Sequence, residues 1–218
     1  MNQNLLAETL LKALSIFLIE YWWLLLVIIV LSISKTRFFK GWVGEQTVRY
    51  ISRTRLEKQD YLAAHNVTLE TGEGTTQIDH IYISQYGLFV VETKNFSGWI
   101  FGSERGATWT QQIYKMKYKF QNPLRQNYKH LKAIESALGI DIRNIHSVIV
   151  FLGGATFKTQ MPDNVRYASN YADYIKSFKA EVFTADQVVE IHNQLLTKRL
   201  KPNYATHKRH MNNLKNRT

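Results

Sequence analysis

Two charged residues of opposite sign end the strongest predicted strand of the sequence. Residues 88–94 read LFVVETK, which predicts a buried central strand that ends with Glu92 and Lys94. Because residues two apart in a strand face the same side, these two side chains project together. A carboxylate and an ammonium group are costly to bury unless they have partners or a chemical role.

A second carboxylate, that of Asp79, lies in the preceding β-rich segment, residues 75–84. A hairpin that pairs about residue 86 places Asp79 opposite residue 93, and a bulge or a small shift in register brings it onto the face of Glu92 and Lys94. Two convergent carboxylates suit a hard cation such as Mg²⁺. The lysine beside them can orient or help deprotonate an attacking water, or neutralise charge on a phosphate. The alternative is a purely structural cross-strand ion pair.

Other charged residues extend this candidate site or have a simpler explanation. Glu45 falls in the first turn of a predicted helix, residues 42–56, where the helix dipole favours an acid in any case. Residues 114–128 interleave aromatic side chains with four basic ones: Lys115, Lys117, Lys119 and Arg125. This pattern suits contact with phosphates plus stacking on bases, and it equally suits a sheet edge protected by lysines.

The histidines show no spacing typical of a metal site. His80 faces the opposite side of its strand from Asp79 and is interpreted as a packed or surface residue, and His65, His130 and His146 are scattered. The chain has no cysteine, which excludes disulfide scaffolds, thiolate zinc sites, iron–sulfur clusters and cysteine nucleophiles. No phosphate-binding glycine loop or serine elbow is present, which argues against nucleotide-driven motors and serine hydrolases.

The elements that position these residues follow the order α-β-β-β-α-β. The helix over residues 42–56 precedes strands over 60–70, 75–84 and 88–94, with turns at 71–74 and 85–87. A hairpin pairs residues 98–101 with 108–113, a helix covers 123–138, and a buried strand covers 145–152. Short strands over 165–168 and 181–184 and a helix over 186–196 complete a small mixed α/β layer structure.

An apolar segment near the N-terminus predicts a single membrane-spanning helix at about residues 16–39. Residues 16–34 contain one charge, that of Glu20, and at 1.5 Å per residue they extend roughly 28 Å, close to the hydrocarbon thickness of a bilayer. The basic residues that follow, Lys35, Arg37 and Lys40, place the soluble part in the cytoplasm, at the inner membrane. A cleaved signal peptide is the alternative, although the segment lacks the basic start that such a peptide needs.

The net charge of +11 favours anionic partners such as nucleic acid or acidic lipid. Much of it lies in residues 198–218, which carry seven basic residues and no acid. This tail is either a solvated terminus or an arm that pairs with phosphates or anionic head groups. The chain therefore divides into an N-terminal segment, residues 1–40, a soluble domain, residues 41–197, and a basic tail.

Five short segments, in this order, resemble the nuclease-related domain (NERD) family. They are GWVGE at 41–45, QIDHIYIS at 77–84, GLFVVETKNFSGWIFG at 87–102, WTQ at 109–111 and NPLRQN at 122–127. That family is assigned to the restriction-endonuclease-like superfamily, whose site is written PD-(D/E)xK. The proline before the aspartate is absent here, since Ile78 precedes Asp79.

The resemblance implies a restriction-endonuclease-like α/β core that uses Mg²⁺ or Mn²⁺. It makes Asp79 and Glu92 the metal ligands, Lys94 the catalytic lysine and Glu45 the helix acid that completes such sites; Gln126 would contact substrate or shape the pocket. We therefore expect a membrane-anchored nuclease that hydrolyses DNA phosphodiester bonds, with RNA and the oligomeric state left open. The alternative is a catalytically inactive, membrane-tethered nucleic-acid-binding or signalling module of the same fold.

Overall fold

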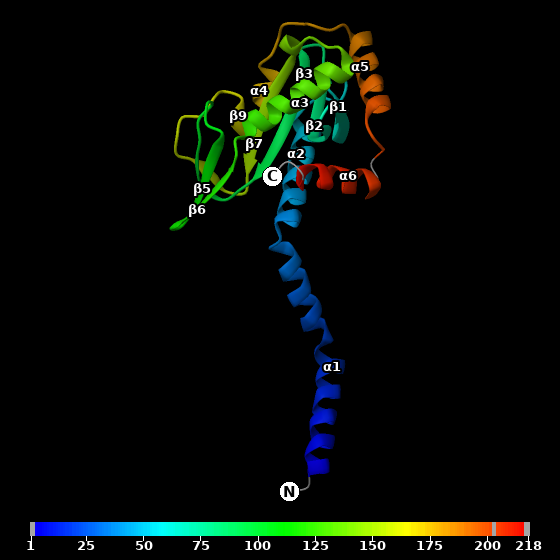
Figure 1. Cartoon of the computed structure of the whole chain (residues 1–218), viewed down its shortest axis with the longest axis vertical. Coiled ribbons are helices and arrows are strands. Elements are labelled where there is room, and N and C mark those ends of the chain that lie inside the picture. The colour runs from blue at the N-terminus through cyan, green and yellow to red at the C-terminus, as the bar shows by residue number, and fades with distance from the viewer. Residues whose placement is uncertain (1–2, 202–203, 216–218) are drawn as a thin grey trace. The chain divides into compact units, whose positions relative to one another are not determined.

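The computed structural model describes residues 3–201 and 204–215, which form a mixed α/β protein with two mixed β-sheets (Figure 1). Residues 1–2 of the N-terminal segment and residues 202–203 and 216–218 of the predicted tail lie outside the described residues. The chain divides into two compact units, Met1–Trp42 and Val43–Thr218. All of the predicted site residues lie in the second unit.

The main sheet has five strands in the order β1-β2-β3-β7-β9. β1 (Leu62–Thr71), β2 (Gly74–Ser84) and β3 (Gly87–Asn95) are antiparallel, whereas β7 (Ile145–Leu152) and β9 (Val165–Tyr167) continue the sheet in parallel. β3 therefore lies at the centre of the sheet. This position explains its apolar sequence, because both of its faces are covered.

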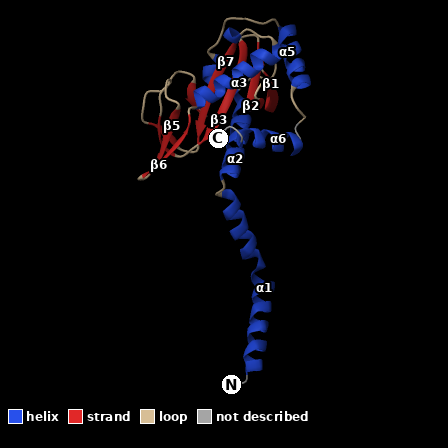
Figure 2. Ribbon diagram, viewed as in Figure 1, coloured by secondary structure: helices blue, strands red, loops and turns tan. Residues whose placement is uncertain are grey.

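Helices cover the two faces of the main sheet, as the ribbon diagram shows (Figure 2). On one face, α3 (Pro123–Leu138) and α5 (Ala185–Lys198) pack on a core that contains Ile81, Leu88 and Val90. On the other face, α2 (Arg37–Arg55) and α4 (Tyr171–Lys176) contribute Val48, Tyr171 and Ile175 to a second core with Tyr82 and Phe89. A short 3₁₀ helix, η1 (Ile142–Asn144), leads into β7.

The second sheet has four strands in the order β6-β5-β4-β8. Its strands are β4 (Gly98–Phe101), β5 (Thr108–Ile113), β6 (Met116–Gln121) and β8 (Ala155–Phe157). One face of this sheet contributes Ile100 and Trp109 to a third core, where they meet Ile149 and Phe151 of β7. The hairpin of β4 and β5 is the one predicted from the sequence, and it is confirmed.

The predicted element order is confirmed in α2-β1-β2-β3-α3-β7, with β4–β6 inserted before α3. The helix over residues 123–138 and the strand over 145–152 have the predicted bounds. The strand predicted over 181–184 is wrong, because these residues form an irregular segment in which the Val182 and Phe183 N–H groups both donate to the Gln85 carbonyl. The sequence reading missed β6, β8 and α4.

The predicted basic tail contains a helix, α6 (Tyr204–Lys215). Arg209 pairs with Glu70 at 2.9 Å, and the Asn213 amide donates to the Thr75 hydroxyl at 3.1 Å. Before α6, the Leu200 N–H donates to the Thr68 carbonyl of the edge strand β1. The described part of the tail is therefore bound to the β1–β2 hairpin, which differs from the solvated terminus expected as one alternative.

The apolar N-terminal segment is helical from Gln3 to Ser34, as α1. No single helix within the described residues is long and apolar enough to cross a membrane, whereas Ala7–Phe17 and Ile19–Ser34, bent by 58°, pass that test as a pair by length and composition. The predicted span over residues 16–39 is wrong in its bounds, because α1 ends at Ser34 and α2 begins at Arg37. A turn at Thr36, whose N–H donates to the Ile33 carbonyl, separates the two helices.

Candidate active site

The charged pair predicted at the end of β3 forms a short contact. Lys94 Nζ lies 2.6 Å from Glu92 Oε1, and the Glu92 side chain is 4% exposed. The Lys94 ammonium also donates to Gln126 Oε1 of α3 at 2.9 Å. Glu92 and Lys94 therefore face the same side of β3, as the two-residue spacing predicts. Gln126 of α3 contacts Lys94 on this side.

The N-terminus of α3 is fixed by a buried asparagine. The Asn122 side chain accepts a hydrogen bond from the Leu124 N–H, which caps the helix, and Pro123 occupies the first turn, where its missing N–H costs nothing. The Asn122 amide also donates to three carbonyls of the loop before β5, those of Ser103, Glu104 and Gly106. The cap therefore sets where α3 begins and, one turn later, where Gln126 lies.

The same helix brings a histidine to the other oxygen of Glu92. His130 Nε2 lies 3.3 Å from Glu92 Oε2, and His130 Nδ1 is 2.8 Å from the Thr76 hydroxyl of β2. His130 is 5% exposed. Gln126 and His130 are four residues apart, so they share one face of α3 and hold Lys94 and Glu92 respectively.

Beside this cluster, the side chains of β1 and β2 no longer alternate regularly between the two faces of the main sheet. Ala64 and Val67 of β1 belong to the same core, and so do Ile78 and Ile81 of β2, although residues three apart in a regular strand face opposite sides. Between Ala64 and Val67, Asn66 has a positive φ of 51°. Both strands therefore change phase at residues 66 and 79.

This irregularity directs Asp79 towards β3. Asp79 Oδ2 accepts a hydrogen bond at 2.8 Å from the Thr93 N–H, the peptide group that follows Glu92. Ladder pairing between β2 and β3 ends at His80 and Val91, so at this point the carboxylate takes the place of a backbone acceptor. Asp79, Glu92 and Lys94 consequently lie at one end of the β2–β3 pair.

The register of the β2–β3 hairpin differs by one residue from the predicted pairing about residue 86. Ser84 pairs with Gly87 and His80 with Val91, so the turn consists of Gln85 and Tyr86 alone. If this register is continued by one residue, Asp79 lies opposite Glu92 and not opposite residue 93. The small shift needed to bring Asp79 to the charged pair is therefore present.

Glu45 approaches the cluster from α2. The expectation that it lies in the first turn of its helix is wrong, because α2 begins at Arg37. The residue before it, Gly44, is buried, and a Cβ at that position would lie 2.8 Å from Asn95 Cβ at the end of β3. The absence of a side chain at Gly44 therefore lets α2 pass close to the strand end that carries Lys94.

The pKa values of the three carboxylates, Glu45, Asp79 and Glu92, are shifted by burial and by neighbouring charges. Burial raises the pKa of Asp79 well above its usual value, and the charges of Glu92 and Glu45 raise it further, against the Thr93 hydrogen bond. Burial also raises the pKa of Glu45, with a smaller contribution from the charge of Glu92. Burial acts in the same direction on Glu92, but Lys94 and His130 outweigh it, so the pKa of Glu92 is lowered to about 2.

This distribution suits a cation ligand set. The two pKa shifts have opposite signs, because negative charge is favoured on Glu92 and disfavoured on Asp79; a nearby divalent cation would favour negative charge on both. Hard oxygen donors are the ligands of Mg²⁺ and Mn²⁺, and Mg²⁺ commonly uses one or two carboxylates. Among the described residues, no group of three or more His, Asp or Glu side chains is arranged to hold a metal ion. The assignment of Asp79 and Glu92 as metal ligands stays a prediction.

The basic residues predicted to bind substrate lie outside this cluster. Lys115 lies in the turn between β5 and β6, and Lys117 and Lys119 lie on β6, an exposed edge strand of the second sheet. Arg125 is exposed on α3 beside Gln126 and donates to the Arg105 carbonyl at 2.9 Å. β6 is an edge strand, as the alternative explanation expects, and the role of its lysines in substrate binding stays a prediction.

The sequence reading missed three polar residues of the cluster: Thr76, Asn127 and His130. Asn127 is fully buried and its amide donates to the Val90 carbonyl at 2.9 Å and to the Ser147 hydroxyl at 2.8 Å, which ties α3 to β3 and β7. The four-residue spacing of Gln126 and His130 on an amphipathic helix was the available signal. Nothing in the sequence indicated Thr76, because its contact depends on how β2 lies under α3.

His80 is a packed residue, in line with its interpretation from the sequence. It is fully buried, and its Nδ1 lies 2.9 Å from Nδ1 of His65 on β1. Burial lowers the pKa of His80 to about 3 and that of His65 to about 4. Both rings are therefore neutral at physiological pH.

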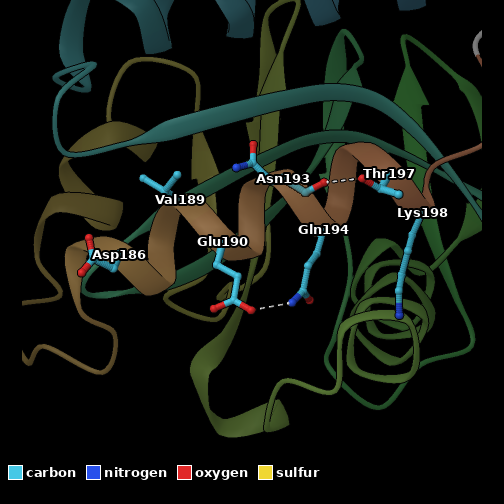
Figure 3. A pocket seen from close by; sticks show the side chains of 7 residues that line it. All are labelled: Asp186, Val189, Glu190, Asn193, Gln194, Thr197 and Lys198. Atoms are coloured by element: carbon cyan, nitrogen blue, oxygen red, sulfur yellow. Dashed lines mark hydrogen bonds between the residues drawn. The ribbon is translucent and has the colours of Figure 1, made fainter.

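A surface pocket of about 510 Å³ on α5 contains none of the predicted site residues (Figure 3). All of its lining side chains come from this one helix. Two of their bonds join near neighbours along it, since Gln194 donates to Glu190 at 3.0 Å and the Thr197 hydroxyl donates to the Asn193 carbonyl at 2.9 Å. Lys198 instead donates to the Ala137 carbonyl of α3. The side chains that line this pocket do not include the charged groups at the end of β3.

Comparison with known proteins identifies the family of this chain. A family model described as nuclease-related domain, NERD, matches residues 40–152, from α2 to the end of β7. An uncharacterized protein of Bacillus anthracis is 41% identical over 163 residues, which cover 72% of this chain and 76% of the relative. No solved structure matches the chain. Since the matched region spans more than half of the chain and contains Glu45, Asp79, Glu92, Lys94 and Gln126, this protein belongs to the nuclease-related domain family.

Proposed function

We propose that this protein is a membrane-anchored, divalent-cation-dependent nuclease that hydrolyses phosphodiester bonds of DNA. The observation that carries the proposal is the convergence of Asp79, Glu92 and Lys94 at the end of β3, where Lys94 Nζ lies 2.6 Å from Glu92. Membership of a nuclease-related family supports the same reaction class.

Asp79 and Glu92 would hold Mg²⁺ or Mn²⁺, and Glu45 would support that ion from α2. When bound, the ion would lower the pKa of a water molecule and offset charge on the phosphate. The proton that the raised pKa of Asp79 retains would leave this carboxylate on ion binding. Binding is therefore expected to tighten as pH rises.

Lys94 would act on the reacting phosphate. Its ammonium is held by Glu92 and Gln126 at 2.6 and 2.9 Å, which fixes its position before substrate arrives. A fixed positive charge at a partly buried position stabilises negative charge that develops on a phosphate, because no solvent has to reorganise. His130 would keep Glu92 in place through its contact at 3.3 Å.

The exposed basic residues would hold the nucleic-acid backbone. Lys115, Lys117, Lys119 and Arg125 are all exposed, and ammonium and guanidinium groups that contact phosphates give affinity without sequence preference. The bent N-terminal helix pair would anchor the protein in the inner membrane, and Lys35, Arg37 and Lys40 would keep the nuclease-related domain in the cytoplasm.

The full-length protein in detergent should cleave DNA with Mg²⁺ or Mn²⁺ and remain inactive in a chelator. Asp79→Ala and Lys94→Ala should each lower the rate by about 100-fold or more, since each removes a group from the reacting centre. Lys132→Ala is the matched control, because Lys132 is an exposed lysine of α3 that pairs with Glu135. Activity that is indifferent to both site substitutions would remove the nuclease assignment.

A second function, binding without catalysis, is favoured by one feature of the same cluster. Both oxygens of Glu92 already have neighbours, Lys94 at 2.6 Å and His130 at 3.3 Å, as in a structural ion pair. A membrane-tethered module of this kind would bind DNA yet leave it intact with either cation. The same assay, combined with a DNA-binding measurement, separates the two functions.

A further inference from the structure

One face of the second sheet carries an exposed tryptophan among polar and basic residues. Trp99 of β4 pairs with Gln112 of β5 and with Thr156 of β8, and Gln112 pairs with Lys117 of β6. Because paired residues share a face, these four side chains lie in one row across the sheet. Lys119 is two residues beyond Lys117 and shares the face, which we call the Trp99 face.

A further lysine, Lys158, extends this face at the opposite edge of the sheet. Lys158 follows β8, its N–H continues the ladder to the Ile100 carbonyl, and its Nζ lies 4.5 Å from the centre of the Trp99 ring. The Trp99 side chain is nevertheless 47% exposed. None of the four strands of this sheet contains an aspartate or glutamate. The face therefore has positive charge on both sides of an accessible aromatic ring.

The core of this region lies on the opposite face of the sheet and does not include Trp99. Ile100 and Trp109 are buried there, and Trp109 stacks on Phe151 of β7 with ring centres 6.1 Å apart. The core of this region is thus complete without Trp99. An exposed tryptophan that contributes to no core is a feature of binding surfaces.

We propose that the Trp99 face binds a single strand of nucleic acid, with a base stacked on Trp99 and phosphates paired with Lys117, Lys119 and Lys158. Sheets that present aromatic rings between basic side chains bind single strands in this way, because unstacked bases offer a free π-face. A paired duplex keeps its bases stacked on one another and gains only the phosphate contacts. This inference deepens the proposed function by naming the form of nucleic acid that the protein takes.

The Trp99 face is close enough to the carboxylate cluster for one strand to reach both. Trp99 is five positions after Lys94, so their Cα atoms are at most about 18 Å apart. At about 3.4 Å per nucleotide this distance corresponds to roughly five nucleotides. The distance between the face and the end of β3 is therefore within the length of a short oligonucleotide.

The test is binding of a fluorescein-labelled 15-nucleotide oligothymidine to the full-length protein in detergent, measured by anisotropy in a chelator. Trp99→Ala should weaken binding by about tenfold, as expected for loss of one stacked base, and Trp99→Phe should retain most of the affinity. Lys117→Ala and Lys119→Ala should each reduce the salt dependence by about one phosphate contact. Trp99→Ala should leave that dependence unchanged.

Tyr118→Ala is the matched control. Tyr118 is also exposed on β6, at 41%, but it lies on the opposite face from Lys117 and Lys119, so its removal should not alter binding. Equal losses for Trp99→Ala on single-stranded and duplex DNA, or no loss on either, would overturn the proposal. Since no cation is present, the result is independent of cleavage, and a protein without nuclease activity can still confirm the Trp99 face.

Discussion

Glu92 is the most enclosed carboxylate of the cluster, and its environment differs from that of Asp79 in the sign of the pKa shift. The Glu92 carboxylate has a lysine 2.6 Å away, whereas Asp79 has two carboxylates near it and one peptide N–H. The pKa values of these two neighbouring acids are therefore shifted in opposite directions, down for Glu92 and up for Asp79. A pair of this kind is typical of sites where a proton or a cation is exchanged.

Asp79→Asn should change how stability depends on pH when no divalent cation is present. The raised pKa of Asp79 gives stability that is complete below 3.8 and is lost as pH rises through the folded value, at up to about 1.4 kcal/mol per pH unit. The difference in unfolding free energy between wild type and Asp79→Asn should therefore fall as pH rises. Urea unfolding in a chelator from pH 5 to pH 8 measures it.

Adding Mg²⁺ supplies the control for this comparison. A cation held by Asp79 and Glu92 stabilises the folded state in proportion to its occupancy, so wild type should gain stability at pH 8 and Asp79→Asn should gain less. Parallel pH curves for the two proteins, together with equal effects of Mg²⁺, would contradict the assignment of Asp79.

Helix α2 carries Glu45 past the end of β3, and its position depends on a close contact. Gly44 lies against Asn95, and Asn95 also limits the space beside Gly153, where a Cβ would overlap with the side-chain oxygen of Asn95. Two glycines therefore surround the residue that follows Lys94. Gly44, the second glycine of the segment GWVGE, is therefore explained by close packing between elements. It does not require a special backbone angle.

Gly44→Ala should displace α2 and lower both stability and cleavage rate. Alanine favours the helix itself by about 1 kcal/mol, but a methyl group 2.8 Å from Asn95 Cβ forces a shift that costs typically 1–3 kcal/mol and moves Glu45. Gly41→Ala on the same helix meets no atom within 4 Å and should be neutral or stabilising. Unfolding and cleavage by the two variants check this, and identical behaviour would count against the contact.

At the scale of the whole molecule, the folded core is independent of the apolar N-terminus. In the part of the chain that the structure describes, none of the three core clusters has a member before Val48. The N-terminal unit ends at Trp42, and α1 has large apolar side chains that are exposed, such as Trp22 and Leu25. Exposed apolar surface of this extent is typical of segments that contact lipid or another protein.

A fragment of residues 37–218 should therefore fold without α1 and stay soluble without detergent. It retains all of α2 and every described core residue, so its unfolding should be a single cooperative transition with the urea midpoint of the full-length protein in detergent. Circular dichroism during urea unfolding measures this. A markedly lower midpoint would show that α1 contributes to the stability of the domain.

The sequence by itself determined the order of the core elements α2-β1-β2-β3-α3-β7, the bounds of α3 and β7, and the pairing of charge at Glu92 and Lys94. These features depend on local rules: helix periodicity with a proline start and a glycine stop, a run of apolar residues in a central strand, and the two-residue alternation of strands. The motif around Asp79 identified a second acid, although its register could not be read, because a turn of two or three residues fits the same letters.

Only the tertiary structure decided which groups meet at the end of β3. The phase change at Asn66 and Asp79, the approach of Gly44 to Asn95, and the contact of His130 with Glu92 each join elements far apart in sequence. Such contacts are set by how whole elements pack, and packing depends on all side chains of a core together. For the same reason, the exposed Trp99 face emerged from the strand pairing, since its residues come from four separate strands.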